Sequence, residues 1–212
     1  MRVPKHIGVI PDGNRRWAVE AGLEKKDGYE KGLNPGVRLL NLARENKIEE
    51  ITYYGFTVDN CKRPKEQVEA FQKACVDAVN LIAENDVSLL VVGNEESKMF
   101  PKELLKYRER VDIGKGGIKV NFLVNYGWEW DLENTCLASG KRGLWNSLKT
   151  SDISRVDLII RWGGRRRLSG FLPIQSVYSD FYVLDTLWPD FRDEDFYKAL
   201  DWYQEQDITL GG

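Results

Sequence analysis

Residues 6–17 read HIGVIPDGNRRW and carry the strongest indication of the fold. Its first half is a mostly apolar, β-rich run, which is typical of a strand covered on both faces of a parallel sheet. Its second half turns through Pro11 and Gly13 into two consecutive arginines. Residues 156–169, VDLIIRWGGRRRLS, follow the same order near the other end of the chain. Each stretch therefore predicts a buried strand that opens into a glycine-bearing, arginine-rich loop.

Strand and helix patterns alternate along the whole sequence. β-Rich runs lie at 6–10, 50–56, 87–93, 118–125, 156–161 and, more weakly, 181–184. Helical patterns lie at roughly 14–22, 30–46, 64–85, 101–112, 130–148 and 191–206. This alternation predicts one α/β domain over residues 1–212, with an about six-stranded, mostly parallel sheet flanked by helices.

The pattern predicts a ligand-binding site at one edge of the sheet and an apolar face on the helix at 64–85. Ligands of parallel sheets bind beyond the carboxyl ends of the strands. The residues that follow the strands should therefore gather at one edge: Asp12, Thr57, Gly93, Asn125 and Arg161. Within 64–85, apolar residues recur at spacings of three and four. That face either belongs to the core or walls an apolar tunnel or pocket, because both need apolar side chains.

The composition is that of an ordinary globular protein, with 30% charged and 42% hydrophobic residues. Because the net charge is only -2, no whole-protein field attracts nucleic acid or anionic lipid, and any anion site must be local. The cysteines Cys61, Cys75 and Cys136 lack metal-ligand spacing and favour reduced thiols in a cytoplasm. Neither a signal-peptide pattern nor an apolar run of ~20 residues is present. We expect a cytoplasmic protein with no nucleic-acid partner and at most peripheral membrane contact.

The first loop has the residues of a phosphate cradle. Gly13 lets backbone N–H groups approach a phosphate, and the helix that follows would present its positive end. Arg16 can bind phosphate through two parallel hydrogen bonds. Asp12 would repel a bare phosphate, so its place beside this cradle suggests a bridging Mg²⁺. The alternative interpretation is Asp12 as a helix N-cap beside exposed arginines.

The second loop is a candidate polyanion clamp. It carries four arginines and a hydroxyl donor: Arg161, Arg165, Arg166, Arg167 and Ser169. A solvated loop and a nucleic-acid contact are the alternatives, and the isolation of the cluster argues against nucleic acid. His6 is the only histidine, at the start of a predicted strand, so we expect a structural role for it and no hydrolytic triad.

Together these motifs resemble the cis-prenyltransferases, the undecaprenyl diphosphate synthase family. The resemblance runs along HIGVIPDGNRRWA, YYGFTVDNCKRP, VNYG, VDLIIRWGGRRRLSGFLPIQSVYSDFYV, LWPDF and a terminal LGG. It implies a single α/β domain with a hydrophobic tunnel, usually present as a homodimer. It also implies an enzyme that joins isopentenyl diphosphate to an allylic diphosphate with the help of Mg²⁺.

The resemblance also implies roles for individual residues. Asp12 would help to bind Mg²⁺ and promote loss of pyrophosphate, with Asp180 as a second metal ligand. Asn60 would accept the proton, with the hydroxyl of Thr57 beside it. The allylic substrate would be held by Gly13, Asn14, Arg15, Arg16, Trp17, Lys25, Tyr29 and Arg63. The second diphosphate would be held by Arg161, Arg167 and Ser169.

Most departures from the family pattern lie around the diphosphate-binding core, and few lie on it. Tyr29 replaces a histidine, and a phenol is neither a cationic ligand nor a base near pH 7. Lys25 replaces an arginine, which keeps the charge and loses the planar fork. Trp128-Glu129 replaces glycine-arginine, and Trp162 replaces threonine. The remaining departures are Cys61, Arg165, Gly170, Thr209 and a shortened segment between 130 and 156. Added aromatic bulk with a shorter middle implies a small cavity.

Three hypotheses follow. The first is a Mg²⁺-dependent prenyltransferase that condenses small isoprenoid diphosphates, dimethylallyl and isopentenyl, into a short-chain prenyl diphosphate. The second is an irregular head-to-middle coupling of two dimethylallyl diphosphates, of lavandulyl or cyclolavandulyl type, because relatives of that branch share the DGY string of residues 27–29. The third is a non-catalytic partner subunit, which the retained Asp12, Asn14, Arg16 and Asn60 disfavour.

Overall fold

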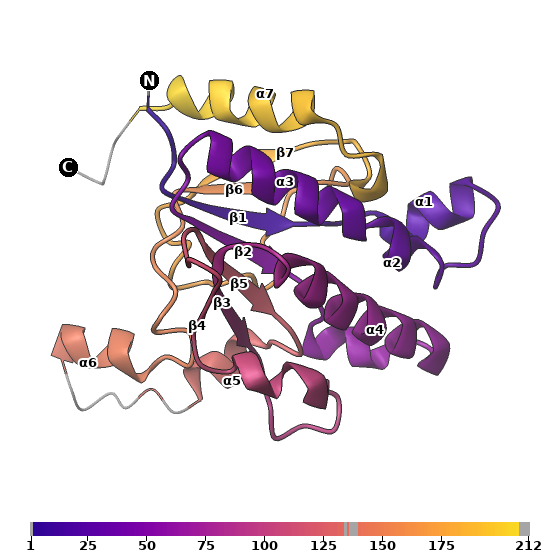
Figure 1. Cartoon of the computed structure of the whole chain (residues 1–212), viewed down its shortest axis with the longest axis horizontal. Helices are drawn as coiled ribbons and strands as arrows, with labels where there is room; N and C mark the ends of the chain where they lie inside the picture. Colours follow the sequence, from indigo (N-terminus) through magenta and orange to yellow (C-terminus); the bar gives the residue numbers. More distant parts are fainter. Residues whose placement is uncertain (1, 134, 136–139, 208–212) are drawn as a thin grey trace.

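Seven strands form one sheet in the order β4-β3-β5-β2-β1-β6-β7 (Figure 1). The structure is a computed structural model and describes residues 2–133, 135 and 140–207. The strands are β1 His6–Ile10, β2 Glu50–Tyr54, β3 Val87–Val92, β4 Val111–Ile113, β5 Lys119–Leu123, β6 Leu158–Arg161 and β7 Asp180–Val183. The neighbouring strands are parallel except for the antiparallel pair β3–β4. The predicted α/β class and mostly parallel sheet are confirmed, and β4 is a seventh strand that the sequence analysis missed.

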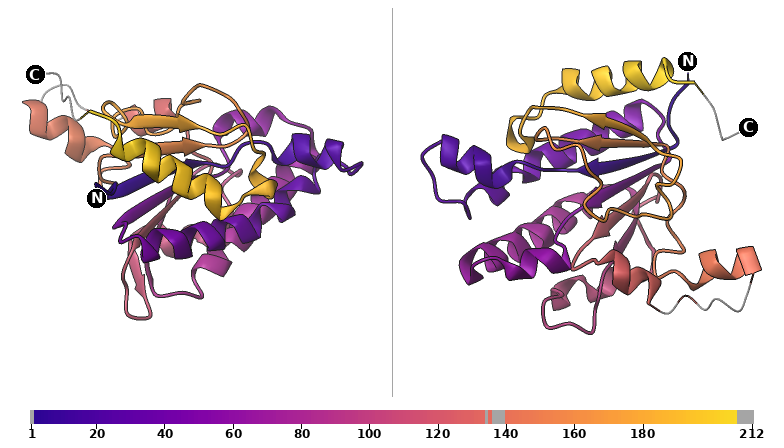
Figure 2. Two further views of the ribbon diagram at one scale, coloured as in Figure 1. Left: turned by 90° about the horizontal axis from the view of Figure 1, so that it is seen from above. Right: turned by 180° about the vertical axis from the view of Figure 1, so that it is seen from behind.

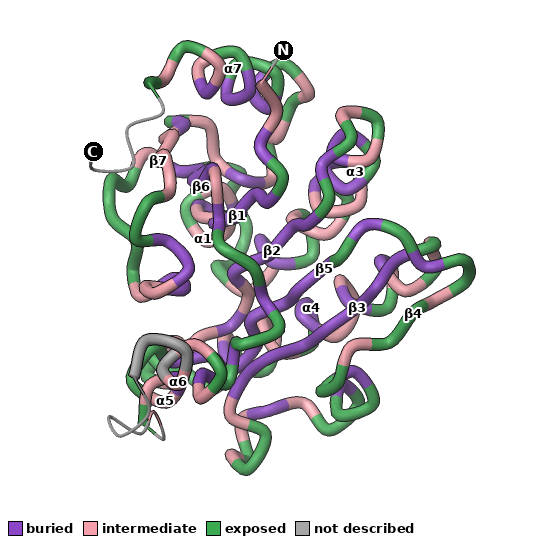
Figure 3. Tube along the Cα trace, turned by 90° about the vertical axis from the view of Figure 1, so that its left-hand side faces the viewer, coloured by how far each residue is buried: buried purple, intermediate pink, exposed green. Residues whose placement is uncertain are grey.

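The central strands are buried along their whole length, as the continuously apolar runs predicted (Figure 3). The short β4 is largely exposed at the edge of the sheet. The register places Ile10 opposite Arg161, and Tyr54 opposite Leu123. The carboxyl ends of β1, β2, β5 and β6 are therefore level, and the loops that follow them meet at one edge.

The helices are α1 Asn14–Glu20, α2 Gly28–Lys31, α3 Leu33–Glu45, α4 Lys65–Ile82, α5 Trp128–Leu132, α6 Gly140–Ser147 and α7 Asp193–Gln204. The single helix expected at 101–112 is wrong. A 3-10 helix, η2, covers Lys102–Tyr107, and the β-branched Val111 and Ile113 then pair with the open edge of β3. The helix expected at 130–148 is two helices, α5 and α6. Cys136, Thr209 and the terminal LGG string lie outside the described residues.

The two faces of the sheet are covered differently. Helices α3, α4 and α7, with η2, cover one face and form the larger apolar cluster with the strands. The other face carries a smaller cluster, closed mainly by loop residues such as Ile153, Phe171 and Leu172. The views in Figure 2 place α1 and α6 at opposite ends of the molecule. On α4, Val68 and Val79 belong to the core alone, whereas Phe71 and Ile82 also line a cavity, so both interpretations of this face hold.

The amino end of the sheet holds a buried network of polar side chains. The ring of His6 contacts Thr52 Oγ1 at 2.8 Å and backbone carbonyls of the 154–155 loop. The Glu50 carboxylate accepts hydrogen bonds from Asn121 at 2.7 Å and from Ser154 Oγ at 2.6 Å. The structural role expected for His6 agrees with this placement. Among the residues that the structure describes, no helix is both long enough and apolar enough to cross a membrane.

Candidate active site

A cleft of about 910 Å³ lies at the carboxyl edge of the sheet, between α1 and the loop after β6. Among the residues predicted for the site, all except Trp17 and Asp180 line this cleft. Two short motifs from opposite ends of the chain meet here because β1 and β6 are adjacent in the sheet. Gly93 and Asn125 follow strands at the same edge but are not among the residues that line the cleft.

Asp12 and Arg161 form the centre of the cleft. Arg161 is 3% exposed and donates to Asp12 Oδ2 at 2.8 Å. Its other terminal nitrogen donates to Ser169 Oγ at 2.9 Å and to the carbonyl of Arg167. Its Nε finds no hydrogen-bond partner among the described residues. A buried guanidinium with one carboxylate and an orphaned donor can accept a further anion.

Arg16 joins the first motif to the second. Its guanidinium lies 3.8 Å from Asp12 Oδ1 and donates to the carbonyl of Gly163 at 2.6 Å. Gly163 has φ +80°, and a Cβ at this position would lie 2.4 Å from the Arg16 guanidinium. A glycine is therefore required here both by the backbone conformation and by the close approach of the arginine.

The opposite wall of the cleft is aromatic and carries one cation. Tyr29 stacks on Phe71 with ring centroids 4.5 Å apart and an interplanar angle of 4°. The Tyr29 hydroxyl accepts a hydrogen bond from Arg63 at 2.9 Å. Burial raises the pKa of Tyr29, so the phenol stays protonated at neutral pH. Tyr29 therefore orients Arg63 and forms a wall, and it does not act as a base.

Thr57 and Asn60 form a capping box at the start of the 3-10 helix η1, Val58–Lys62. The backbone N–H of Thr57 donates to Asn60 Oδ1 at 3.0 Å. That contact fixes the orientation of the amide, since only its oxygen can accept. The NH₂ group of Asn60 has no partner among the described residues and is the part left for a ligand.

A smaller apolar pocket of about 70 Å³ adjoins the cleft. The two cavities share six lining residues: Pro11, Asn14, Tyr29, Tyr54, Gly55 and Phe71. Behind this shared wall the pocket is lined by α3 and α4, including Cys75. Burial raises the pKa of the Cys75 thiol to about 12, so it serves as an apolar wall. The apolar cavity expected from the sequence is thus present as a small pocket.

Asp180 is not brought to Asp12, which corrects the predicted pair of metal ligands. It is the first residue of β7, opposite Leu158 at the amino end of β6, and it lies 3.5 Å from Arg2. Asp12 follows the other end of the adjacent strand. The two carboxylates are therefore separated by the length of β6, on the order of 10 Å. They cannot share one ion within a single chain.

Two tryptophans also lie elsewhere than predicted. The indole of Trp17 donates to Asp190 at 2.7 Å, outside the cleft. Trp162 is fully buried and packs edge-on against Trp188, with ring centroids 4.8 Å apart. It lines neither cavity, so it belongs to the core and does not narrow the substrate space directly.

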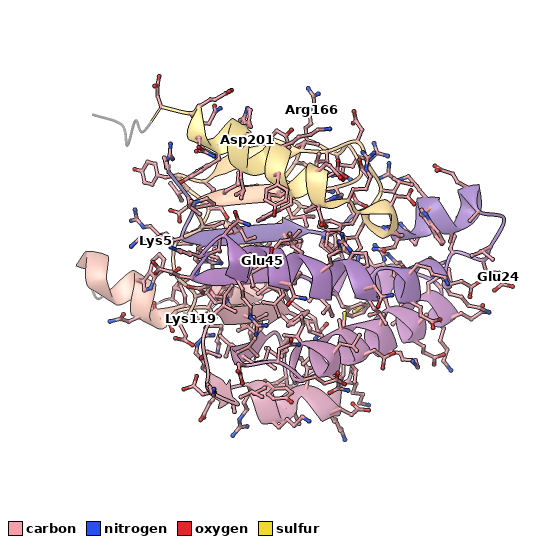
Figure 4. The ribbon with its side chains drawn as sticks, turned by 45° about the horizontal axis from the view of Figure 1, so that its top comes forward. Lys5, Glu24, Glu45, Lys119, Arg166 and Asp201 are labelled. Atoms are coloured by element: carbon pink, nitrogen blue, oxygen red, sulfur yellow. The ribbon has the colours of Figure 1, made fainter. Side chains whose placement is uncertain are left out.

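The sequence analysis missed several cleft residues. The structure adds Tyr54, Phe71, Trp128, Arg165 and Gly170 to the lining. Arg165 stands in the arginine run, so its charge was a signal, whereas Arg166 projects away from the body of the protein (Figure 4). Trp128 stood out as a departure from the family pattern, whereas Tyr54 and Phe71 gave no separate signal, because an apolar side chain in the core and one in a cleft look alike in sequence.

The cleft suits a metal ion that is bound mainly by substrate phosphates and water, with few protein ligands. In the described ranges, no three His, Cys, Asp or Glu side chains gather closely enough to hold an ion. Mg²⁺ is usually held by one or two carboxylates together with substrate phosphates and water. Asp12, the carboxylate at the centre of an arginine-rich cleft, fits that arrangement.

Comparison with known proteins agrees with this geometry. The family model for undecaprenyl diphosphate synthase matches residues 10–211. The ditrans,polycis-undecaprenyl-diphosphate synthase ((2E,6E)-farnesyl-diphosphate specific) of Yersinia pseudotuberculosis is 30% identical over 100% of this chain and 91% of its own length. An isoprenyl transferase of Chlorobaculum tepidum is 31% identical over 99% of this chain and 86% of its own.

A solved structure shares the fold. Lavandulyl diphosphate synthase from Lavandula x intermedia, in complex with dimethylallyl diphosphate, superposes with a TM-score of 0.88 at 22% identity and covers 99% of both chains. At this identity the likeness concerns the fold alone. The family model and the sequence relatives decide the assignment: the chain belongs to the undecaprenyl diphosphate synthase family, the cis-prenyltransferases, and is an enzyme that transfers prenyl groups.

Proposed function

We propose that this chain is a Mg²⁺-dependent prenyl diphosphate synthase that condenses dimethylallyl and isopentenyl diphosphates into a short product. The observation that carries the proposal is the apolar pocket of about 70 Å³ behind Tyr29 and Phe71. Because roughly 10–15 Å³ of such volume holds one water molecule, this pocket accepts a few waters or about one five-carbon unit. A short product of about ten to fifteen carbons is therefore expected, with one isoprenoid unit in this pocket and the rest of the chain in the adjoining cleft.

The residues of the cleft divide between two diphosphates. Arg15, Arg16 and Arg63 would hold the allylic diphosphate with its prenyl tail in the pocket, since Arg63 donates to Tyr29 on the wall that the two cavities share. Arg161, Arg167 and Ser169 would hold the second diphosphate. Bound side by side, the two substrates react as one complex, which lowers the entropic part of the barrier.

The same arginines would stabilise the charge that develops on the departing pyrophosphate. Mg²⁺, when bound at Asp12, would neutralise part of that charge as a Lewis acid. Arg161 holds only Oδ2 of Asp12, at 2.8 Å, so Oδ1 would be the oxygen left to hold the ion. The apolar wall of Tyr29 and Phe71 would keep water from the allylic cation.

Proton removal after coupling is expected to depend on a group other than Tyr29, which remains a neutral phenol. Asn60 commits its amide oxygen to the Thr57 backbone. We expect Asn60 to orient a substrate oxygen or a water through its NH₂ group, and the pyrophosphate product to be the nearest strong acceptor for the proton. This refines the proton-accepting role that the resemblance implies for Asn60.

The irregular coupling of two dimethylallyl diphosphates is the second candidate. A pocket that fits one five-carbon tail suits it as well, because both of its substrates carry five carbons. Tyr29, the residue of the DGY string, stands at the mouth of that pocket and bonds Arg63. The product of dimethylallyl diphosphate incubated alone distinguishes the two reactions.

The test is product analysis with defined substrates. The purified enzyme is incubated with Mg²⁺ and dimethylallyl, geranyl or farnesyl diphosphate, each with and without isopentenyl diphosphate, and products are identified by mass spectrometry. We expect a short product from dimethylallyl with isopentenyl diphosphate. A branched or cyclic ten-carbon diphosphate from dimethylallyl diphosphate alone would favour the irregular reaction. A polyprenyl ladder from farnesyl diphosphate would overturn the short-chain proposal.

A matched pair of variants tests the pocket wall. Tyr29→Ala removes the ring that stacks on Phe71 and should lengthen the product by about one isoprenoid unit. Tyr197→Ala removes an exposed ring on α7, outside both cavities, and should leave the product unchanged. The proposal extends to a cytoplasmic homodimer, as the family resemblance implies, and light scattering of the purified protein measures that oligomeric state.

A further inference from the structure

Trp128 is a large aromatic residue that is left exposed inside the cleft. It is the first residue of α5, it lines the cleft, and it is 44% exposed. Of the other tryptophans, Trp162 and Trp188 are buried and the remaining four are partly buried, so Trp128 is the most exposed of the seven. A half-exposed indole in a cleft is informative because burying it against a ligand would release water from its surface.

The position of the indole is set by Gly170. A Cβ on Gly170 would lie 2.9 Å from Trp128 Cδ1, a distance that side chains do not tolerate. Gly170 also has φ +81°, a conformation that favours glycine. The ring of Trp128 therefore rests directly on the backbone of the 169–170 turn, in the space that any side chain at position 170 would take.

That turn is part of the second anion site. Ser169 Oγ accepts a hydrogen bond from Arg161 at 2.9 Å, and the Ser169 carbonyl accepts one from Tyr54 at 2.7 Å. The indole of Trp128 thus flanks the site that the proposed function gives to the second diphosphate. An anion held by Arg161 and Ser169 would leave its organic part beside this ring.

We propose that Trp128, seated on Gly170, is a specificity-determining residue for the second substrate. Its indole face packs against the hydrocarbon part of the diphosphate held by Arg161 and Ser169, and so selects an isoprenoid over a polar phosphate ester. This inference rests on the two-site arrangement of the proposed function. It does not depend on whether the product is regular or irregular, because in both reactions the second substrate is a small prenyl diphosphate.

Binding without turnover gives the first test. Acrylamide quenching of tryptophan fluorescence is measured with inorganic pyrophosphate and with isopentenyl diphosphate, without an allylic substrate. We expect isopentenyl diphosphate to protect the fluorescence more than pyrophosphate does, and Trp128→Phe to abolish the difference. Trp145→Phe, which changes a ring on the remote helix α6, should preserve it.

The outcomes are separable. Equal protection by the two anions, or a difference that survives in Trp128→Phe, overturns the role of Trp128 while leaving the prenyltransferase proposal intact. Failure of both anions to bind would refute the second anion site and this inference with it. Turnover is not needed for either result, so inactivity of the enzyme under the chosen conditions does not confuse them.

A double-mutant cycle gives the second test. Trp128→Ala should weaken binding of isopentenyl diphosphate roughly 10-fold and leave the affinity for pyrophosphate unchanged. Gly170→Ala should weaken it as well, because the new methyl group displaces the indole. In the Trp128→Ala background, Gly170→Ala should have little further effect. Independent, additive effects of the two substitutions, in proteins with normal thermal unfolding, would overturn the proposal.

Discussion

Both ends of the sheet bury charged and polar side chains, but only at the amino end are their charges and hydrogen bonds matched by protein partners. At the amino end, near Lys5 and Lys119 in Figure 4, Glu50, Asn121 and Ser154 are hydrogen-bonded to one another. At the carboxyl end, the arginines of the cleft outnumber its carboxylates, and Arg161 Nε has no partner among the described residues. A closed network needs nothing further, whereas an excess of cations with an orphaned donor needs an anion.

The difference shows how a structural polar cluster can be separated from a binding site. Burial alone does not separate them, because Glu50 and Arg161 are both 3% exposed. What differs is the balance of charge and the number of unmet hydrogen bonds. Substitutions at the amino end should therefore change stability, and substitutions at the carboxyl end should change substrate binding and rate.

The largest effect is expected at Asp12. Asp12→Ala should reduce turnover on the order of 10²-fold or more, because it removes the carboxylate that would hold Mg²⁺ at the departing charge. The fold should survive, although the melting temperature should fall somewhat, because the buried Arg161 loses its carboxylate partner. Glu45→Ala, which removes an exposed carboxylate of α3, is the control (Figure 4). Normal turnover of Asp12→Ala with added Mg²⁺ would show that the assignment of Asp12 is wrong.

The next effect separates two arginines of the second anion site. Arg161→Ala should raise the KM of the second substrate and also lower kcat, because Arg161 holds Asp12 as well as Ser169. Loss of a charge-assisted contact corresponds to roughly 10- to 100-fold in affinity. Arg167→Ala, at an exposed position, should raise only the KM of the second substrate, and less strongly. Steady-state kinetics with each substrate varied in turn would contradict the two-site arrangement if both KM values rose equally.

At the amino end, Glu50→Ala should act on stability. It leaves the donors of Asn121 and Ser154 without their buried acceptor, which costs about 2 kcal/mol of unfolding free energy. Urea unfolding followed by circular dichroism measures the loss. The KM values of both substrates should stay within a factor of about two at a temperature where the variant is folded. A large KM change in a fully folded variant would break the distinction between the two ends.

The smallest effect is a pH dependence of stability at the amino end. Burial lowers the pKa of His6, although the charges of Glu50 and Asp157 oppose the shift. Burial opposes the shift of Glu50, yet His6 and the hydrogen bonds hold the pKa of Glu50 below its usual value. In both cases the unfolded chain binds the proton more readily, so stability is complete above the unfolded pKa and falls as pH decreases.

The free energy of unfolding should therefore decline as pH falls below about 6.5, the unfolded pKa of histidine, and the melting temperature should decline with it. For one proton the slope of the free energy is at most about 1.4 kcal/mol per pH unit. A second decline should begin near the unfolded pKa of glutamate. His6→Asn should abolish the first decline and weaken the second, because the His6 charge helps to hold the pKa of Glu50 down while the hydrogen bonds to Glu50 remain. Melting temperatures that rose on acidification from neutral pH would contradict the placement of a neutral His6.

Most of the local elements and the chemistry of the two loops could be predicted from the amino-acid sequence alone. Apolar runs give buried strands, and the alternation with helices gives an α/β sheet, because these periodicities depend on neighbouring residues. The sequences around Asp12 and Arg161 also indicated anion binding, because glycine lets the backbone approach a phosphate and arginine binds it. The same sequences carried the family resemblance. The sequence analysis did not predict β4, because its three residues acquire a strand conformation only by pairing with β3.

The tertiary structure decided which side chains share a space. Asp180 begins its strand and so lies at the far end of the sheet, although the family resemblance implied a metal ligand there. Trp162 entered the core and Trp128 remained in the cleft, because the packing around each ring, and not its chemistry, sets its exposure. The size of the apolar pocket likewise depends on how α3 and α4 pack against the sheet, a long-range arrangement that no local pattern of residues encodes.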